Sequence, residues 1–384
     1  MREISHELEK IKKSALYREY KSIEGAQGPY IQIENQTYLS FCSNNYLGLA
    51  NHPFIINAVI KAVNQYGWGA GASRLVSGNM VLHEKLEYEI SRLKNRNSTI
   101  IFPTGYMANV GTICALAGKE DLIICDKLNH ASIIDGCRLS GATFRVYPHC
   151  DLIKLEKILK NSTHFRRKLI VTDTVFSMDG DLAPLPDIVT IARNHHAMIM
   201  VDEAHGTGVF GKNGTGVVEH FGLHSEINIV IGTLSKAIGS LGGFVSGDTD
   251  LINYLRNRAR TFIYTTALPP AVCAASIAGI ELLRKDHTLR ESLWRNTHYL
   301  KDRLKAFDLK IIPSESPIIP IIIGNARKAL EVSEFLFKRG ILIPAIRPPT
   351  VPDESSRLRI TIMATHTEDE LEKLLDILKD IQYL

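Results

Sequence analysis

The sequence predicts an α/β protein with two domains. The first is a large domain whose mostly parallel sheet is covered by helices, and the second is a smaller α+β domain towards the C-terminus. Between residues 98 and 248, short apolar segments alternate with segments of helical periodicity, which is typical of a parallel sheet with helices on both faces. From residue 318 onwards the alternation is less regular. A chain of 384 residues with 45% hydrophobic residues is long enough for two packed domains.

Charge and composition argue against several classes of protein. The formal net charge is +4 and the basic residues are scattered, so nucleic acid is a poor candidate partner. The N-terminal segment is charged and helical in pattern, without the apolar core of a signal peptide, and no apolar run approaches the length of a membrane span. Six cysteines without a CxxC pair indicate buried free thiols in a reducing compartment. We therefore expect a cytoplasmic protein without a metal site.

Periodicity and turn residues assign the elements before residue 98. Residues 1–20 are charged and helical in pattern, residues 30–42 alternate like a pair of strands, and SNNYLG at 43–48 is a polar loop. Two segments of helical periodicity, 52–67 and 80–95, flank a loop dense in glycine. Such a loop is either a flexible linker or a segment whose backbone approaches another group closely.

The alternating region supplies the large sheet. Its strands are short apolar runs, and the segments between them have helical periodicity. The expected strands are 98–103, 121–126, 143–148, 168–176, 197–204, 227–233 and 242–248, and the expected helices are 105–117, 130–140, 151–161 and 185–196.

The C-terminal part has the pattern of a smaller domain. Its expected elements are helices 270–285 and 289–307, strand 318–324, helix 329–340, a proline-rich loop at 341–352, strand 357–363 and helix 367–381. We place the change of domain near residues 269–285. The predicted division is an N-terminal segment at 1–45 that completes the small domain, a large domain at 46–275 and a small domain at 276–384.

Lys236 follows one of the predicted strands and enters a turn rich in glycine. The segment from 227 to 243 reads INIVIGTLSKAIGSLGG, so its backbone can turn tightly and approach a ligand. Thr233 and Ser235 stand beside the lysine and could donate hydroxyl groups to an anion. Partial desolvation would lower the pKa of the lysine and make it a Schiff-base nucleophile at neutral pH. The alternative is a surface lysine in an ordinary turn.

A carboxylate lies near the end of the preceding predicted strand, and an imidazole follows that strand. Asp202 comes near the end of the apolar run AMIMVDEA, and His205 follows three residues later. Asp202 would lie at the carboxyl edge of a parallel sheet, where open α/β folds bind ligands. Pyridoxal phosphate (PLP) needs a carboxylate at its pyridine nitrogen, a lysine for its aldehyde and donors for its phosphate. Taken together with Lys236, Asp202 and His205 favour a site for PLP. The alternatives for the single residues are that Asp202 is a helix N-cap and that His205 is an ordinary loop histidine.

Three further strand ends could contribute to the same site. Gly105 and Tyr106 begin a helix whose first N–H groups could bind a phosphate, unless this is an ordinary strand-to-helix turn. His130 could stack on a flat ring or hydrogen-bond a loop. Ser177 could bond the phenolic oxygen of the cofactor.

Arginines are the candidates for substrate binding. Arg359 alternates with apolar neighbours in RLRITIM, so it needs a partner, either a substrate α-carboxylate or a structural Asp or Glu. Arg347 lies in AIRPPTVP, where three prolines stiffen the loop that presents Thr350. Near the N-terminus, Arg18 could reach the site or remain on the surface.

Over nearly its whole length the chain resembles the α-oxoamine synthases among the fold-type I PLP-dependent enzymes, which share the fold of aspartate aminotransferase. The matching segments, in the expected order, are SNNYLGL, GAGASRLVSG, NHASIIDG, VFSMDGDLAPL, VDEAHGTGVFG, GTLSKAIGSLGG, IYTTALPP and RLRITIMATH. The resemblance implies a large PLP-binding domain, a smaller C-terminal domain and a homodimer with shared active sites.

The resemblance also implies a role for each candidate residue. Lys236 would form the Schiff base, Asp202 would pair with the pyridinium and His130 would stack on the ring. The other implied cofactor contacts are His205 and Ser177 at the phenolic oxygen, Gly105, Tyr106, Thr233 and Ser235 around the phosphate, and Thr265 or Thr266 at the phosphate of the neighbouring subunit. The implied substrate contacts are Asn44, His130, Arg347, Thr350 and Arg359. The family also has an N-terminal arginine that contacts the substrate and aligns with Tyr17 or Arg18, so Arg18 is a further implied contact.

The implied reaction condenses L-alanine with a pimeloyl thioester, carried by CoA or by acyl carrier protein, at the start of the biotin ring system. AIRPPTVP is the segment that favours these substrates. One alternative is 2-amino-3-ketobutyrate CoA ligase, which would use glycine and acetyl-CoA. Another is a non-catalytic ligand-binding protein of the same fold, which would be expected to lose Lys236 or one of the cofactor's partners.

Overall fold

The computed structural model describes residues 2–383 of the chain. The backbone divides into two compact units. The large unit comprises His52–Phe176 and Leu182–His287, and the small unit comprises Met1–Asn51, Ser177–Asp181 and Thr288–Leu384. The small unit is therefore assembled from both ends of the chain and one short internal segment. The division at residues 45 and 275 stays a prediction of domain organisation.

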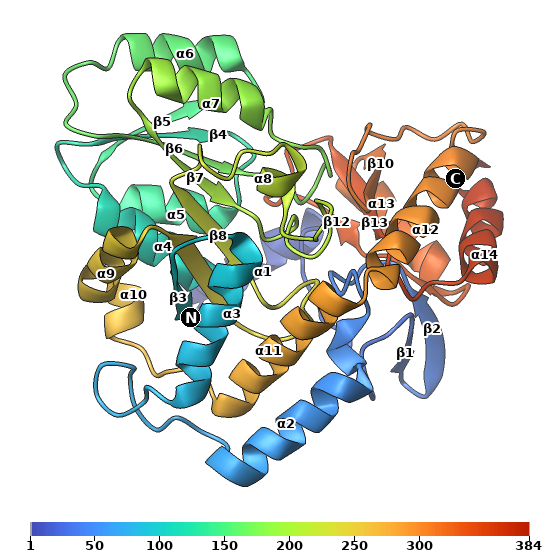
Figure 1. Ribbon diagram of the computed structural model, residues 1–384. Coiled ribbons are helices and arrows are strands. Elements are labelled where there is room, and N and C mark those ends of the chain that lie inside the picture. The colour runs from blue at the N-terminus through green and yellow to red at the C-terminus, as the bar shows by residue number, and fades with distance from the viewer. Residues whose placement is uncertain (1, 384) are drawn as a thin grey trace. The chain divides into compact units, whose positions relative to one another are not determined.

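The large unit is built on a seven-stranded sheet (Figure 1). Within the described residues its strand order is β3-β9-β8-β7-β6-β4-β5. β9 runs antiparallel to its neighbours β3 and β8, and the other neighbouring strands are parallel. The strands are β3 (Ser98–Phe102), β4 (Leu122–Asp126), β5 (Thr143–Tyr147), β6 (Lys168–Asp173), β7 (Met198–Asp202), β8 (Ile229–Thr233) and β9 (Gly243–Gly247). The predicted α/β fold with a mostly parallel sheet is confirmed.

Several helices of the large unit begin at residues suited to helix N-caps. Thr104 accepts a hydrogen bond from Met107 N–H at the start of α4, and Asp151 accepts one from Lys154 N–H at the start of α6. The helices of this unit are α2 (Pro53–Tyr66), α3 (Val81–Lys94), α4 (Gly105–Leu116), α5 (Ala131–Leu139), α6 (Leu152–Lys160), α7 (Leu185–Asn194), α8 (Val217–His220), α9 (Thr249–Arg258), α10 (Arg260–Ile263) and α11 (Pro270–Lys285). α9 is absent from the predicted elements, because only Ile252 and Leu255 on its buried face are apolar and fully covered.

Helices cover both faces of the large sheet, and this explains why its strands are apolar throughout. On one face, strand residues such as Phe102, Val171 and Ile231 share a core cluster with residues of α4, α5 and α9. Strand side chains alternate between the faces, so intervening residues such as Ile124 and Val201 are buried on the other side. α3 and α7 contact the sheet and lie outside that cluster, with α3 against β3 and β9 and α7 against β7.

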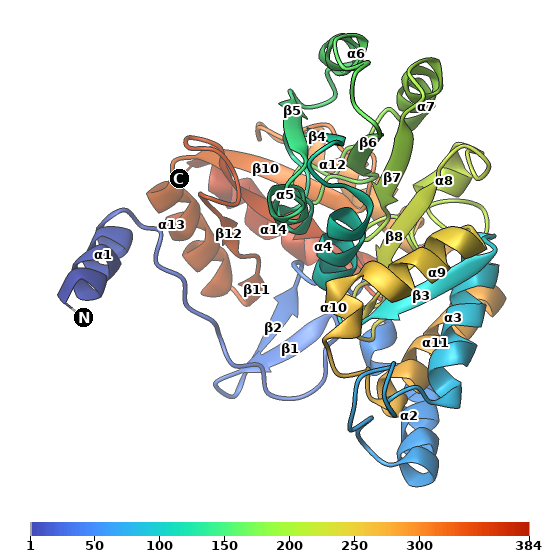
Figure 2. The same ribbon diagram turned by 90° about the vertical axis from the view of Figure 1, so that its left-hand side faces the viewer.

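The small unit contains two three-stranded sheets among the described residues. One has the order β10-β13-β12 and is antiparallel. In the other, β2 pairs with β1 as an antiparallel hairpin and with β11 in parallel (Figure 2). The strands are β1 (Tyr30–Ile33), β2 (Gln36–Ser40), β10 (Ile318–Gly324), β11 (Ile341–Leu342), β12 (Ala345–Ile346) and β13 (Ser356–Thr361), and the helices are α1 (Arg2–Lys13), η1 (Leu49–Asn51), α12 (Thr288–Leu304), α13 (Ala326–Phe337), α14 (Glu368–Lys379) and η2 (Asp380–Tyr383).

The composition predicts buried free thiols and no membrane-spanning helix, and the structure bears on both expectations. All six cysteines are free thiols, as expected. Only Cys125, Cys137 and Cys273 are buried, however, and the other three are partly exposed. Among residues 2–383, no helix combines the length and the apolar character needed to span a bilayer.

Candidate active site

Lys236 lies in the turn that follows β8. The turn is closed by hydrogen bonds from Leu234 N–H to Gly242 O (2.9 Å) and from Ser240 N–H to Leu234 O (2.8 Å). Gly239 has φ +71° within this turn, a conformation that disfavours other residues. The lysine is partly buried, and its Nζ lies 2.9 Å from Nε2 of His205. The structure therefore presents the predicted lysine in a fixed turn with an imidazole as its partner.

His205 is held in place by the loop between Asp202 and α8. The buried carboxylate of Glu203 accepts hydrogen bonds from Val217 N–H (3.0 Å) and Val218 N–H (2.8 Å) across this loop. Lys94 donates from Nζ to Thr207 Oγ1 (2.7 Å) and to Thr215 O. Burial raises the pKa of Glu203 and lowers the pKa of Lys94 to about 8. These interior contacts tie both ends of the loop that carries His205.

Asp202 and His130 are connected through two polar side chains. Asn109 Nδ2 donates to Asp202 Oδ2 (2.7 Å) and to Ser132 Oγ (3.0 Å). Ser132 Oγ lies 2.8 Å from His130 Nδ1, which also accepts from Ser132 N–H (3.3 Å). Since Nδ1 is the acceptor, a neutral His130 carries its proton on Nε2. The other oxygen of Asp202 accepts from Ala204 N–H (2.8 Å), so the carboxylate is oriented by both of its oxygens.

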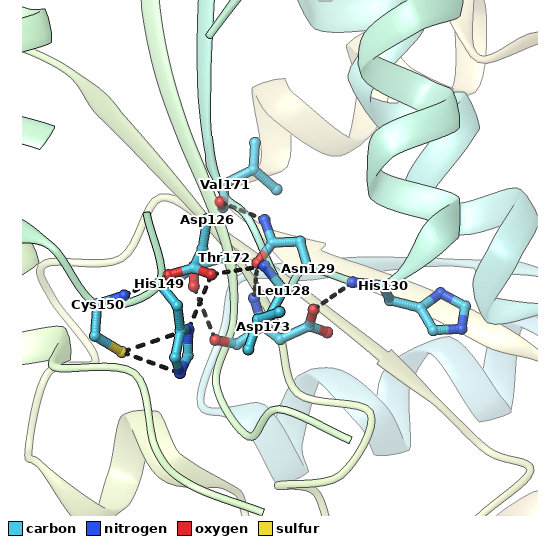
Figure 3. A network of polar contacts seen from close by, with 9 residues as sticks. All are labelled: Asp126, Leu128, Asn129, His130, His149, Cys150, Val171, Thr172 and Asp173. Atoms are coloured by element: carbon cyan, nitrogen blue, oxygen red, sulfur yellow. Dashed lines mark hydrogen bonds and ion pairs between the residues drawn. The ribbon is translucent and has the colours of Figure 1, made fainter. Parts of the chain in front are cut away.

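The backbone of His130 is fixed by the neighbouring strand β6 (Figure 3). Asp173, the last residue of β6, accepts a hydrogen bond from His130 N–H (2.7 Å), and its own N–H donates to Asn129 Oδ1 (3.1 Å). Burial raises the pKa of Asp173 well above its ordinary value, and the charge of Asp202 on the adjacent strand adds to the rise. In Figure 3 the imidazole of His130 points away from this network, and it also serves as the N-cap of α5.

The hydroxyl groups of Thr233 and Ser235 lie close to the start of α4 and form with it a candidate anion cradle. Gly105 and Tyr106 are the first residues of α4, so their N–H groups lie at the positive end of its dipole. A Cβ on Gly105 would lie 3.6 Å from Thr233 Oγ1, and Thr233 Oγ1 is 2.8 Å from Ser235 Oγ. A Cβ on Gly243 would lie 2.6 Å from Gly105 N and Cα. Residue 243 must therefore be glycine for β9 to pack against the start of this helix.

The hydrogen bonds of Arg359, in the small unit, go to neutral oxygens. Its side chain is buried, and it donates to Ser177 O (2.5 Å), Thr361 Oγ1 (2.9 Å) and Asn44 Oδ1 (3.2 Å). Among the described residues, the structure gives Arg359 no ion pair with Asp or Glu. The structural carboxylate considered as an alternative is thus not found. Three of the predicted residues, Arg359, Asn44 and Ser177, come together here.

Arg18 and Arg347 form a second group within the small unit. Arg347 donates to the carbonyl oxygens of Ala15 and Tyr17 (3.1 Å for the latter), and Arg18 donates to Pro348 O (3.1 Å). Burial lowers the pKa of Arg347, and the nearby charge of Arg18 lowers it further. The two segments therefore carry adjacent positive charges.

The other predicted residues lie on exposed or partly exposed segments. Thr350 is exposed, and its N–H donates to Arg347 O (3.1 Å). Thr265 is partly buried and Thr266 exposed, in the loop between α10 and α11. The hydroxyl of Tyr106 donates to Asp135 Oδ2 (2.6 Å), so this side chain points to Asp135 and contributes its backbone to the cradle.

The residues of the large unit fit PLP chemically. Asp202 is a carboxylate suited to a pyridine nitrogen, and Lys236 supplies an amine. The N–H groups at the start of α4 and the hydroxyl of Ser235 supply donors for a phosphate, while the hydroxyl of Thr233 beside them donates to Gly242 O (2.8 Å). The structure adds Asn109, Ser132 and Asp173, which are absent from the predicted set. Asn109 is a fully buried amide within the otherwise apolar segment GYMANVGTICAL, and a buried polar residue of this kind is the signal that could have identified it.

Comparison with known proteins identifies the family. A family model described as aminotransferase class I and II matches residues 36–378. The chain belongs to this family and, within it, to the α-oxoamine synthases. The predicted family is thereby confirmed, while the roles of the individual residues stay predictions.

Several relatives with a named activity are similar to this chain over nearly its whole length. The chain is 47% identical to the 8-amino-7-oxononanoate synthase of Citrifermentans bemidjiense, covering 99% of this chain and 98% of the relative. It is 46% identical to that of Thermoanaerobacter pseudethanolicus, covering 97% and 94%. Among solved structures, a serine palmitoyltransferase from S. paucimobilis with bound PLP and myriocin is 33% identical, has a TM-score of 0.95 and matches over 99% of this chain and 97% of that one.

Proposed function

We propose that this chain is a PLP-dependent acyltransferase that condenses L-alanine with a pimeloyl thioester in biotin biosynthesis. The products are 8-amino-7-oxononanoate, CO2 and the free thiol. The observation that carries this function is identity of 44% to 47% with several 8-amino-7-oxononanoate synthases across nearly the whole chain. The side-chain chemistry at Lys236, Asp202 and Arg359 agrees with this reaction.

The residues of the large unit would hold the cofactor as the family pattern implies. When bound, PLP supplies an electron sink that makes the α-proton of an amino acid acidic. Asp202 would keep the pyridine nitrogen protonated, because Asn109 and Ala204 N–H orient its carboxylate. Gly105, Tyr106, Thr233 and Ser235 would bind the phosphate. His130 would stack on the ring, with its orientation fixed by Ser132.

Lys236 is the base that takes the α-proton of L-alanine. His205 Nε2 lies 2.9 Å from the lysine amine, so the imidazole can share the proton that the lysine takes up. The carbon that loses its proton then attacks the thioester carbonyl, the sulfur leaves as a thiolate that takes a proton from water, and the carboxyl group of alanine departs as CO2. Lys236 returns a proton to the same carbon. His205 and Ser177 are proposed to contact the phenolic oxygen.

Arg359 and Asn44 would bind the carboxylate of the amino acid. A buried guanidinium whose partners are neutral oxygens gains a strong, charge-assisted interaction when a carboxylate arrives. Arg347, Thr350 and Arg18 are proposed to contact the acyl donor or its carrier, since the two arginines place adjacent positive charges on one face of the small unit.

We expect the substitution Arg359→Met to raise the KM for L-alanine by at least about 30-fold, because a lost charge-assisted contact to a carboxylate costs about 2 kcal/mol or more. The KM for the pimeloyl thioester should change little. Steady-state kinetics with each substrate varied in turn would measure both constants. Arg339→Met, at an exposed arginine of the same unit, is the control. An unchanged KM for alanine would contradict the assigned role.

We further propose that the protein is a homodimer in which Thr265 or Thr266 reaches the phosphate of the partner subunit. We assign to the dimer interface three exposed apolar side chains of the large unit, Trp68, Val76 and Tyr264, which are 68%, 80% and 71% exposed. Sedimentation equilibrium should give the mass of two chains, and Val76→Asp should shift it towards one. Ile153→Asp, at another exposed apolar residue, should leave it unchanged. A monomeric wild type would refute the proposal.

A paired assay tests the proposed function. The purified protein, saturated with PLP, is supplied with pimeloyl-CoA, pimeloyl-acyl carrier protein or acetyl-CoA, each with L-alanine or glycine, and thiol release is followed. Turnover with L-alanine and a pimeloyl thioester is expected. Turnover only with glycine and acetyl-CoA would indicate a 2-amino-3-ketobutyrate CoA ligase instead. Stable binding of PLP without turnover of any pair would indicate a ligand-binding protein.

A further inference from the structure

Three side chains of different chemistry meet at the carboxyl ends of β4 and β5 in the large unit. Asp126 is the last residue of β4, and His149 and Cys150 follow β5 closely. The two strands are parallel neighbours, with Asp126 beside Tyr147 in the register, so the segments after them run side by side. Figure 3 shows the carboxylate, the imidazole and the thiol turned towards one another.

The donor atoms of this cluster are close enough to share one ion. His149 Nδ1 lies 3.0 Å from Asp126 Oδ1, and Cys150 Sγ lies 3.7 Å from Nδ1 and from Nε2 of the same imidazole. All three groups offer ligand atoms within 4.8 Å of one another. Zinc–ligand bonds of about 2.0 Å to nitrogen or oxygen and 2.3 Å to sulfur place two ligands of one tetrahedron about 3.2 to 3.6 Å apart. Asp126 and His149 are already close to this spacing, so a small rotation of the Cys150 side chain would bring the set to coordination distance.

We propose that Asp126, His149 and Cys150 form a binding site for Zn²⁺. Thiolate, imidazole and carboxylate are the ligand types that Zn²⁺ takes in proteins, and three protein ligands leave one position for water. A harder ion such as Mg²⁺ or Ca²⁺ prefers oxygen ligands alone and does not match this set. On binding, the ion takes the place of the Nδ1 proton, which moves to Nε2, and the thiol proton passes to water.

The surroundings orient these ligands before any ion arrives. Asp126 is fully buried and accepts hydrogen bonds from Leu128 N–H and Cys150 N–H, both 2.8 Å long. The imidazole of His149 packs edge-on against Phe176, with 4.4 Å between the ring centroids, which restricts its rotation. The imidazole and the thiol remain partly exposed, so an ion can reach them from solvent.

The backbone of Cys150 supports a specific role for this residue. Its φ angle is +54°, in the left-handed region that cysteine rarely adopts and that glycine and asparagine tolerate better. This conformation, held by Asp126 through the Cys150 N–H, points the thiol at His149. Sequence spacing does not indicate the site, because its ligands come from two strand ends and only two of them are adjacent in the chain.

Equilibrium dialysis of the intact, PLP-saturated and untagged protein against Zn²⁺ tests the proposal. The wild type should bind one Zn²⁺ per chain at the site. Cys150→Asn should weaken the affinity for Zn²⁺ by at least about 100-fold, because it removes a direct ligand, whereas loss of a residue that only contacts a ligand has a smaller effect. Cys150→Asn suits the backbone, so the variant should fold. His149→Gln, which can still donate to Asp126, should weaken binding in the same way. Cys114→Ala, at another partly exposed cysteine, should leave binding unchanged.

Cobalt provides a second measurement that reports the ligands themselves. Co²⁺ bound to the wild type should show the visible bands of tetrahedral cobalt, and Cys150→Asn should lack them. Absence of a stoichiometric ion in the wild type, or equal binding by wild type and Cys150→Asn, would overturn the proposal. Neither measurement depends on the reaction that the enzyme catalyses, so failure of the proposed function would leave this test intact.

Discussion

The substitution Lys236→Ala is expected to reduce turnover of L-alanine and pimeloyl-CoA by at least about 10⁴-fold. The variant would lose the amine that we propose as both nucleophile and general base, and general acid–base catalysis alone contributes about 10² to 10⁴-fold. The His205 imidazole remains but loses the lysine amine that lies 2.9 Å from its Nε2. Stopped thiol-release assays with long incubation would measure the residual rate, and the visible absorbance of the PLP-loaded protein would report loss of the covalent link.

Lys119→Ala is the matched control for this experiment, because Lys119 is an exposed lysine of the same unit. It should retain both the absorbance and the rate of the wild type. More than about one hundredth of the wild-type rate in Lys236→Ala would be inconsistent with the assignment of the lysine as base, given the loss expected for a catalytic base.

The second large effect is expected for Asp202→Asn. The substitution keeps the size of the side chain and one oxygen, but it removes the negative charge that would hold a proton on the pyridine nitrogen. Loss of one oriented electrostatic contact at a reacting centre costs about 2.7 to 4 kcal/mol, so kcat should fall by about 10² to 10³-fold. The KM for pimeloyl-CoA should change little, since the carboxylate is proposed to touch the cofactor and not the acyl donor.

Two quantities should be measured for Asp202→Asn: kcat, and the affinity for PLP by titration of the cofactor-free protein. Asp248→Asn serves as the control, because Asp248 is exposed at the end of β9 and makes no side-chain cap for α9. Wild-type kcat in Asp202→Asn would remove this residue from the catalytic set. A fall in kcat of the same size in both variants would show that the effect is not specific to position 202.

The sequence predicts the residues of this site that stand at strand ends. Asp202 ends β7 and Lys236 follows β8, and the apolar runs of both strands are buried on both faces. The carboxyl ends of parallel strands meet at one edge of the sheet. The sequence pattern alone therefore predicts that Asp202 and Lys236 lie close together in space. Asn109 lies on a helix and reaches Asp202 only through the packing of α4 on the sheet, which no local pattern encodes.

Partners that depend on tertiary structure also limit what the sequence predicts. The pattern around Arg359 shows that a charge is buried but leaves its partner open, and the structure supplies Ser177, Thr361 and Asn44 in place of a carboxylate. α9 escapes prediction because few of its residues face the core. Prediction of the fold class requires only the alternation of apolar strands and helices, so it is more reliable than prediction of these details.

The assembly of the small unit from both ends of the chain has a consequence for the order in which a newly synthesised protein can fold. β2 acquires its parallel neighbour β11 only when synthesis reaches Leu342, and the apolar residues Ile31, Ile33 and Tyr38 then gain Phe337 and Leu342 as packing partners. The segments of the large unit, by contrast, are all made by His287. Domains generally fold as units during synthesis, and contacts between distant segments form slowly. We therefore expect the large unit to fold first, and the N-terminal hairpin to lack its parallel neighbour until β11 has been synthesised.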